Sequence, residues 1–251
     1  VAPRLAYGTA LIKLGQNCDR VISLDGDVKN STYAEKFKKV FPDRFVECFI
    51  AEQNMVGVAI GCGTRLRTIP YCSTFATFFT RAYDQLRMGA VSMANIKCCG
   101  SHVGCSIGED GPSQMGLEDI GMFRSLPGST VFYPSDAVSM ERAVELSAQI
   151  HGICFIRSTR AVMPILYSND EVFEIGRGKM IRQSANDKIL LVGAGVTLVE
   201  CVKAADELAK KGVHCAIMDP FTLKPIDKNL LIEQGKRVGG KIITVEDHYY
   251  E

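Results

Sequence analysis

The residues with the clearest chemical potential lie between Gly100 and Gln114. This stretch holds His102, two carboxylates at Glu109 and Asp110, the amide of Gln114 and four glycines within fifteen positions. Glycines allow a backbone to approach a ligand closely, and polar side chains on a loop can then be directed at it. An isolated Gly-Glu-Asp-Gly-Pro segment is more typical of a surface turn, so the prediction of a binding loop depends on the rest of the chain.

A carboxylate and two aromatic residues could form a second part of such a site. Glu52 is expected in the first turn of a helix over 51–66, where the helix dipole alone would explain an acidic residue. The functional interpretation is a buried carboxylate that hydrogen-bonds a ring nitrogen. Phe75 and Phe78 are expected on one face of a helix over 75–88, either as core residues or as walls that grip a flat heterocycle.

Three further polar residues, Arg4, Ser31 and Arg160, are candidates for binding an anion. Each one alone is more typical of a solvated surface. Arg160 directly follows an expected strand, where ligands of open parallel sheets bind, and a guanidinium matches phosphate oxygens in geometry. Because the formal net charge is only +1, an anionic ligand would have to be held by a few local Arg or Lys residues.

A glycine-rich turn, Val192-Gly193-Ala194-Gly195, follows one expected strand and precedes a helix. This placement is similar to the start of a dinucleotide-binding fingerprint, in which phosphate lies at a helix N-terminus. The third glycine of that fingerprint is absent, because Leu198 stands in its place. We therefore interpret this turn as structural.

Composition narrows the class of protein. The 29 Lys and Arg residues against 28 Asp and Glu leave no basic excess for nucleic acid or an anionic membrane surface. No apolar run is long enough to span a bilayer, and no signal peptide opens the chain. The ten cysteines include no Cys-x-x-Cys pair, which favours a reduced, cytoplasmic protein over a zinc ribbon or a disulfide framework. Since the chain begins at Val1, we expect part of a longer protein.

Alternating strand and helix patterns predict an α/β fold with two parallel-sheet domains. In the first domain, strands are expected at 20–24, 67–72, 96–100, 130–133 and 153–156, with helices at 51–66, 75–88, 114–125 and 137–149. In the second, strands are expected at 188–192, 214–219 and 241–245, with helices at 197–211 and 227–234. The polar, irregular stretch 160–186 indicates a linker with edge structure, so we expect domains over 1–165 and 186–251 joined by 166–185.

Taken together, the motifs of this chain resemble those of the transketolases. The match runs from Pro3-Arg4 to Val245-Glu246-Asp247-His248. Its strongest segments are Leu24-Asp25-Gly26-Asp27, Lys29-Asn30-Ser31-Thr32, Ala51-Glu52-Gln53-Asn54-Met55, Cys72-Ser73-Thr74-Phe75, Gly100-Ser101-His102, Gly108-Glu109-Asp110-Gly111-Pro112-Ser113-Gln114 and Asp219-Pro220-Phe221-Thr222. Gln114 and the Ala51–Asn54 form are similar to the animal enzymes, since the yeast and bacterial type has His where Gln114 stands.

The resemblance implies a pyrimidine-binding domain followed by an incomplete transketolase C-terminal domain. The family's diphosphate-binding domain has no counterpart here. In the family, that domain would bind the Mg²⁺ or Ca²⁺ ion. Asp25-Gly26-Asp27 of this chain is not followed by a metal-binding Asn at a suitable distance, so we assign no metal ligand to this chain. The resemblance further implies thiamine diphosphate as cofactor, sugar phosphates as substrates, a cytoplasmic homodimer with sites between subunits, and a role in the pentose phosphate pathway.

Roles carry over residue by residue as implications of the resemblance. The catalytic residues would be Glu52, which shares a proton with the cofactor's pyrimidine ring, and His102. The residues expected to bind cofactor are Glu52, Phe75, Phe78 and Gln114. The residues expected to bind substrate are Arg4, Ser31, His102, Asp110 and Arg160. This chain departs from the yeast-type pattern at Arg81, where those enzymes place Tyr, so a third aromatic wall is not expected.

The resemblance leaves two alternatives open. One is a related thiamine-diphosphate enzyme, such as a deoxyxylulose-phosphate synthase or the β subunit of a 2-oxoacid dehydrogenase. The sugar-phosphate residues argue against the second of these. The other alternative is a noncatalytic partner of full-length transketolase, which the retained catalytic-type residues do not favour. Because the chain lacks the diphosphate-binding domain, we expect it to be inactive alone, and supplying that domain discriminates between these functions.

Overall fold

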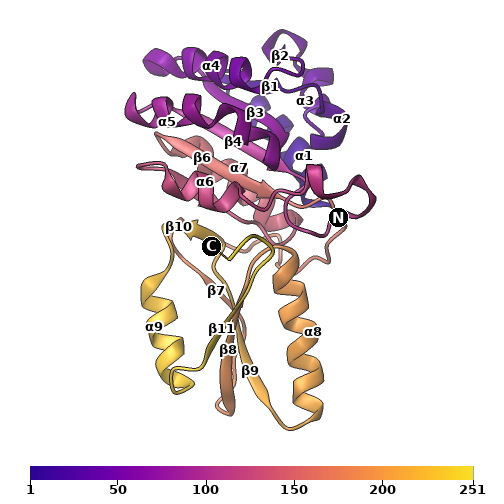
Figure 1. Cartoon of the computed structure of the whole chain (residues 1–251), viewed down its shortest axis with the longest axis vertical. Coiled ribbons are helices and arrows are strands. Elements are labelled where there is room, and N and C mark those ends of the chain that lie inside the picture. Colours follow the sequence, from indigo (N-terminus) through magenta and orange to yellow (C-terminus); the bar gives the residue numbers. More distant parts are fainter. Residues whose placement is uncertain (251) are drawn as a thin grey trace.

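Seven strands form one largely parallel sheet in the computed structural model, which describes residues 1–250 (Figure 1). The strand order is β10-β5-β6-β4-β3-β1-β2, and every neighbouring pair is parallel except β10 with β5. These strands are β1 (Val21–Asp25), β2 (Phe45–Glu47), β3 (Ile69–Phe75), β4 (Ile96–Ser101), β5 (Thr130–Phe132), β6 (Ile153–Ser158) and β10 (Thr222–Lys224). The central strands β4 and β6 are buried along their whole length, as expected of a parallel sheet covered on both faces.

Helices cover the two faces of this sheet. On one face, Tyr7, Leu11 and Phe37 form a cluster with side chains of α7. On the other face, Phe79 and Phe123 pack around the Phe155 ring, which stacks on Phe123 at 3.9 Å. The first set of helices is α1 (Pro3–Asn17), α3 (Glu35–Val40) and α7 (Ala137–Gln149), and the second is α4 (Glu52–Gly63), the 3-10 helix η3 (Ala76–Ala82), α5 (Tyr83–Val91) and α6 (Asp119–Ser125).

A four-stranded sheet forms the second unit, in the order β11-β8-β9-β7. Its strands are β7 (Lys179–Arg182), β8 (Asp187–Gly193), β9 (His214–Asp219) and β11 (Ile242–Val245), flanked by α8 (Val196–Lys210) and α9 (Lys228–Arg237). Leu198 of α8 packs with Leu191 and Ile217 on one face. Leu230 of α9 packs with Leu190 and Met218 on the other. Only β7 runs antiparallel to its neighbour.

The two units are joined through buried contacts and one shared strand. Strand β10 follows the second unit's β9 in the chain, yet it pairs with β5 of the first sheet. The Tyr167 hydroxyl donates to Asp219 Oδ2 at 2.6 Å across the joint. Gly195 has a φ of 59°, and a Cβ atom there would lie 2.2 Å from the Tyr133 ring. Packing against Tyr133 explains this glycine, in agreement with a structural role for the turn.

The structure confirms the α/β class and its two parallel-sheet units, and it corrects two predicted elements. The predicted helix over 75–88 is confirmed only in part, because Phe75 still pairs with β4, and the 3-10 helix η3 precedes an α-helix that begins at Tyr83. The predicted helix over 114–125 begins only at Asp119, since Pro112–Gln114 form a separate 3-10 turn, η5. Helix α1 was not predicted. Among residues 1–250, no helix has both the length and the apolarity to span a bilayer.

Candidate active site

The predicted site residues follow the carboxyl ends of neighbouring strands. Phe75 is the last residue of β3, His102 comes directly after β4, and Arg160 lies two residues beyond β6. Ser31 lies in the short helix α2 (Lys29–Thr32), which follows β1, and Glu52 opens α4 after β2. Since these strands are parallel neighbours, their carboxyl ends gather at one edge of the sheet, where α/β proteins bind ligands.

A row of stacked rings forms the centre of this edge. The Phe75 and Phe78 rings stack with centroids 5.1 Å apart, and the His102 ring stacks on Phe75 at 3.8 Å. Phe75 and Phe78 therefore lie together as predicted, although a strand end and a 3-10 helix place them, not one helical face. Both rings are half-buried, which leaves part of their surface available to a flat ligand.

His102 is held in an uncommon backbone conformation and in a neutral state. Its φ is 60°, a left-handed value that non-glycine residues adopt mainly where the surrounding structure imposes it. Its Nδ1 lies 2.9 Å from Ser101 Oγ. Burial lowers the pKa of His102 to about 4, and the Arg4 charge adds to this effect while Asp110 opposes it. The imidazole is therefore uncharged near neutral pH.

Two charged residues, Asp110 and Arg160, lie near the Nε2 atom of His102. Arg160 Nε is 3.1 Å from Asp110 Oδ2, and the same oxygen is 3.6 Å from His102 Nε2. Arg160 also donates to the Ile107 carbonyl at 2.9 Å, which fixes the guanidinium on the loop. The structure thus brings three predicted residues, His102, Asp110 and Arg160, into one cluster.

Arg4 lies within the electrostatic range of this cluster. It donates through Nη1 to the Ser31 carbonyl at 2.9 Å. Burial lowers the pKa of Arg4, and the charge of Arg160 lowers it further, against the opposing effects of Tyr33 and Asp110. The buried Nε atom of Arg4 has no hydrogen-bond partner within residues 1–250. Two guanidinium groups with an unused donor form a site suited to an anion.

Glu52 lies at the opposite end of the aromatic row. It is only 2% exposed, and its Oε2 accepts a hydrogen bond from Arg81 Nη1 at 3.1 Å. The Arg81 guanidinium lies 5.8 Å from the Phe78 ring centroid, so it connects the carboxylate to the aromatic row. No described residue hydrogen-bonds Oε1 of Glu52, which leaves one carboxylate oxygen for a ligand. The Glu52–Arg81 ion pair is a feature of this region that the sequence did not predict.

Gln114 lies at the end of η5, which contacts η3. Its Oε1 accepts a hydrogen bond from Ser113 Oγ at 2.5 Å. The side chain is half-buried. The structure therefore places the turn that carries Gln114 against the 3-10 helix that carries Phe78.

Two protein-family models match the chain. The pyrimidine-binding domain of transketolase matches residues 1–164, and the transketolase C-terminal domain matches residues 178–251. The first of these covers more than half of the sequence. The chain belongs to the transketolase family. Membership of this family implies binding of thiamine diphosphate.

Curated relatives include animal transketolases. Mouse and human transketolase are each 59% identical over all 251 residues, and bovine transketolase-like protein 1 is also 59% identical. The chain spans about two fifths of the length of these relatives: 40% of the mouse and human transketolases and 42% of the bovine protein.

Solved structures show the same fold. A structure described as a split-gene transketolase in an inactive β4 tetramer matches with a TM-score of 0.89 and 36% identity, covering 99% of this chain and 80% of that one. A transketolase from Pichia stipitis in complex with xylulose 5-phosphate matches with a TM-score of 0.87 at 21% identity, covering 39% of that chain. At that identity the second match supports the fold alone.

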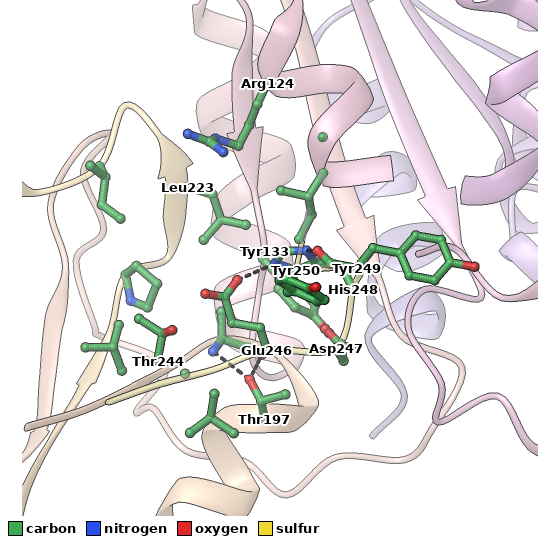
Figure 2. Close-up of a pocket in the computed structure, with 18 of the residues that line it drawn as sticks. Arg124, Tyr133, Thr197, Leu223, Thr244, Glu246, Asp247, His248, Tyr249 and Tyr250 are labelled. Atoms are coloured by element: carbon green, nitrogen blue, oxygen red, sulfur yellow. Dashed lines mark hydrogen bonds and ion pairs between the residues drawn. The ribbon is translucent and has the colours of Figure 1, made fainter. Parts of the chain in front are cut away.

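The transketolase-family chain also contains a cavity apart from these residues. It has a volume of about 600 Å³ and lies between α6, β10 and the carboxyl ends of β8 and β11. Figure 2 shows its wall, with Arg124, Tyr133, Thr197 and residues of the C-terminal segment. None of the predicted site residues lines it. The predicted site residues of this family member and this cavity are therefore separate features of the described residues.

The neutral state of His102 gives a first testable prediction. An NMR pH titration of the imidazole is expected to show a midpoint at about 4, below the ordinary value of 6.5. Because the folded state then resists protonation, His102 lowers the free energy of unfolding as the pH falls from 6.5 towards about 4. Exposed His214 supplies a solvent-accessible reference signal. A midpoint at or above 6.5 would contradict the burial described here.

Proposed function

We propose that this chain supplies the pyrimidine-binding half of a transketolase active site. The complete enzyme would transfer a two-carbon glycolaldehyde unit from a ketose phosphate to an aldose phosphate, in the cytoplasmic pentose phosphate pathway. The observation that carries the proposal is a row of neighbouring side chains, which runs from a buried carboxylate through stacked rings to the Arg160 guanidinium, with the Arg4 guanidinium within electrostatic range. The members of this row are Glu52, Arg81, Phe78, Phe75, His102, Asp110, Arg160 and Arg4.

The residues at the Glu52 end fit the pyrimidine half of thiamine diphosphate. Glu52 Oε1 can share a proton with a ring nitrogen, while Arg81 holds Oε2 in place. Phe78 and Phe75 would present ring surface to a flat heterocycle, and Gln114 would also bind the cofactor. Thiamine diphosphate, when bound, supplies a nucleophilic carbon for bond cleavage next to a carbonyl. The low exposure of Glu52 keeps water away from the shared proton.

The residues at the other end fit a sugar phosphate. Arg160 and Arg4 would bind the phosphate, with Ser31 beside Arg4. Neutral His102 can accept or donate a hydrogen bond to a sugar hydroxyl, because it carries one proton on its two ring nitrogens. Asp110, which is close to both His102 and Arg160, would bind the 2-hydroxyl of the acceptor sugar.

The phosphate assignment predicts the effect of removing one guanidinium. Arg160→Ala is expected to weaken binding of ribose 5-phosphate by about 10- to 150-fold, because one charge-assisted contact is worth about 1.5–3 kcal/mol. Isothermal titration calorimetry at fixed ionic strength measures the change. Arg87→Ala, which removes an exposed arginine paired with Asp84, is the matched control. Equal affinity of the Arg160 and Arg87 variants would contradict the assignment.

A homodimer is part of the proposal. Helix α4 exposes an open surface at Gly57 and Gly61, where an added Cβ atom would meet nothing within 4 Å. Phe49 and Ile50, just before this helix, are 68% and 73% exposed. Large exposed apolar side chains beside a smooth helix face are typical of a protein interface. A second copy, together with the diphosphate-binding domain and its Mg²⁺ or Ca²⁺ ion, would complete the site.

The deciding experiment is an assay of two-carbon transfer from xylulose 5-phosphate to ribose 5-phosphate with thiamine diphosphate and Mg²⁺. The chain is assayed alone and after mixing with a separately prepared diphosphate-binding domain. Activity in the mixture only supports a divided transketolase site. If the two pieces associate without turnover, a related thiamine-diphosphate enzyme or a noncatalytic partner becomes the better explanation.

A further inference from the structure

We propose that the C-terminal segment Glu246–Tyr250 is a clamp that positions the loop from His102 to Leu117, and with it the side chains of His102 and Asp110. The segment follows β11 of the second unit, whereas the loop connects β4 to α6 of the first. Figure 2 shows Tyr133, Asp247 and Tyr249 of this region together. That the clamp positions His102 and Asp110 for a substrate rests on the proposed function, whereas its effect on the conformation of the loop does not.

Arg157 is the centre of the clamp. Its guanidinium is fully buried at the end of β6 and uses all three nitrogens. Nε donates to Asp119 Oδ2 at 2.7 Å, and Nη1 donates to Asp247 Oδ1 at 2.5 Å. Nη2 donates to the Gly116 carbonyl at 3.0 Å and to the Asp247 carbonyl at 3.2 Å. One cation therefore ties the base of the loop, the start of α6 and the C-terminal segment together.

Besides its ion pair with Arg157, Asp247 makes two further contacts, one with Tyr133 and one with Gly104. Its Oδ2 accepts a hydrogen bond from the Tyr133 hydroxyl at 2.9 Å, and the Tyr133 ring lies 4.4 Å from the Arg157 guanidinium. The same carboxylate packs against Gly104, where an added Cβ atom would lie 1.9 Å from Oδ2. Because Gly104 has no side chain, the carboxylate reaches the loop backbone directly.

The backbone of the segment also binds the loop. The Tyr249 amide donates to the Leu117 carbonyl at 3.2 Å. The two ends of the loop are joined by Gly104 N to the Gly116 carbonyl at 2.8 Å, and by Gly116 N to the His102 carbonyl at 3.1 Å. The clamp therefore acts on a closed loop whose first residue is His102 in its left-handed conformation. Loosening the base of the loop frees both His102 and Asp110.

The test uses the chain without cofactor or sugar. Asp247→Asn removes the charge but keeps the shape, and Tyr133→Phe removes one hydrogen bond to Asp247 while keeping the ring. Asp206→Asn is the matched control, because Asp206 belongs to an exposed ion pair with Arg182 in the second unit. Hydrogen exchange reports on the amides of 103–117, with the core strand β9 as the reference for global stability.

An NMR titration of His102 supplies a second readout that a general loss of stability does not move. The charged groups that face this imidazole are Asp110, Arg4 and Arg160. For Asp247→Asn we expect exchange in 103–117 to rise about tenfold or more relative to β9. We also expect the titration midpoint of His102 to move up from about 4 towards 6.5. Tyr133→Phe should give the same changes with smaller amplitude.

Two outcomes would overturn the clamp. The first is equal acceleration of exchange in 103–117 and in β9, with an unchanged His102 midpoint, because Asp247 would then contribute only to overall stability. The second is no difference between Asp247→Asn and the Asp206→Asn control. Since no cofactor or substrate takes part, a failure of the proposed two-carbon transfer leaves this result valid, and a failure of the clamp leaves the transfer assay valid.

Discussion

Replacing Glu52 by Gln is expected to reduce two-carbon transfer by about 100- to 10,000-fold, the range typical of removing an acid–base group. The amide keeps the shape of the side chain and one oxygen, but it cannot exchange a proton with a ring nitrogen. Arg81 would also lose its ionic partner, which lies 3.1 Å away. The measurement is the transfer rate of the chain mixed with the diphosphate-binding domain, at saturating thiamine diphosphate.

The control for Glu52 is a second glutamate with a different environment. Glu141 lies on α7, on the other face of the sheet, and pairs with Lys13 at the surface. Glu141→Gln is expected to retain the full rate, since exposed ion pairs contribute little. If Glu52→Gln and Glu141→Gln gave similar rates in an active mixture, the carboxylate would have no part in the proton exchange.

Replacing Arg157 by Met is expected to lower the free energy of unfolding by about 3–5 kcal/mol. The Met side chain fills similar space, but Asp119 and Asp247 would be left buried without a cation. Burial already raises the pKa of Asp119 against the effect of Arg157. The loss should therefore shrink as the pH falls, because an unpaired buried carboxyl takes up a proton more readily.

Denaturant unfolding at two pH values measures this effect. Arg182→Met, which breaks the exposed pair with Asp206, is expected to cost less than about 1 kcal/mol. A similar small cost for Arg157→Met would show that the buried cluster is energetically replaceable, as some buried ion pairs are.

Local patterns predicted elements well where local chemistry determines them. The helix 137–149 and the strand 214–219 are confirmed with the same bounds. For the helix, a capping box explains the agreement, because Asp136 accepts from the Ser139 amide at 2.8 Å. Phe75 shows where local patterns fail. The spacing of Phe75 and Phe78 suggested one helical face, but Phe75 pairs with β4 and so belongs to a strand. Such pairing depends on residues distant in the chain.

In the candidate site, too, local features were predictable from the sequence and contacts between distant residues were not. The residue types were identifiable from the sequence, and the structure brings His102, Asp110 and Arg160 together. The roles assigned to them stay predictions. The Glu52–Arg81 pair was not foreseen, because it joins the start of one helix to the end of another, 29 positions apart. The signal available was Arg81 itself, a charged residue at helical spacing from Phe78.

Strand β10 has a consequence for the solubility of the first sheet. It pairs antiparallel with β5 and supplies Lys224, whose ammonium group caps the carbonyls of Arg124 and Leu126. Without the second unit, β5 would present a row of unpaired backbone groups at a sheet edge, which is a template for adding strands from other molecules. The second unit thus protects the first against edge-to-edge aggregation, and a shortened protein that ends near residue 165 would lose that protection.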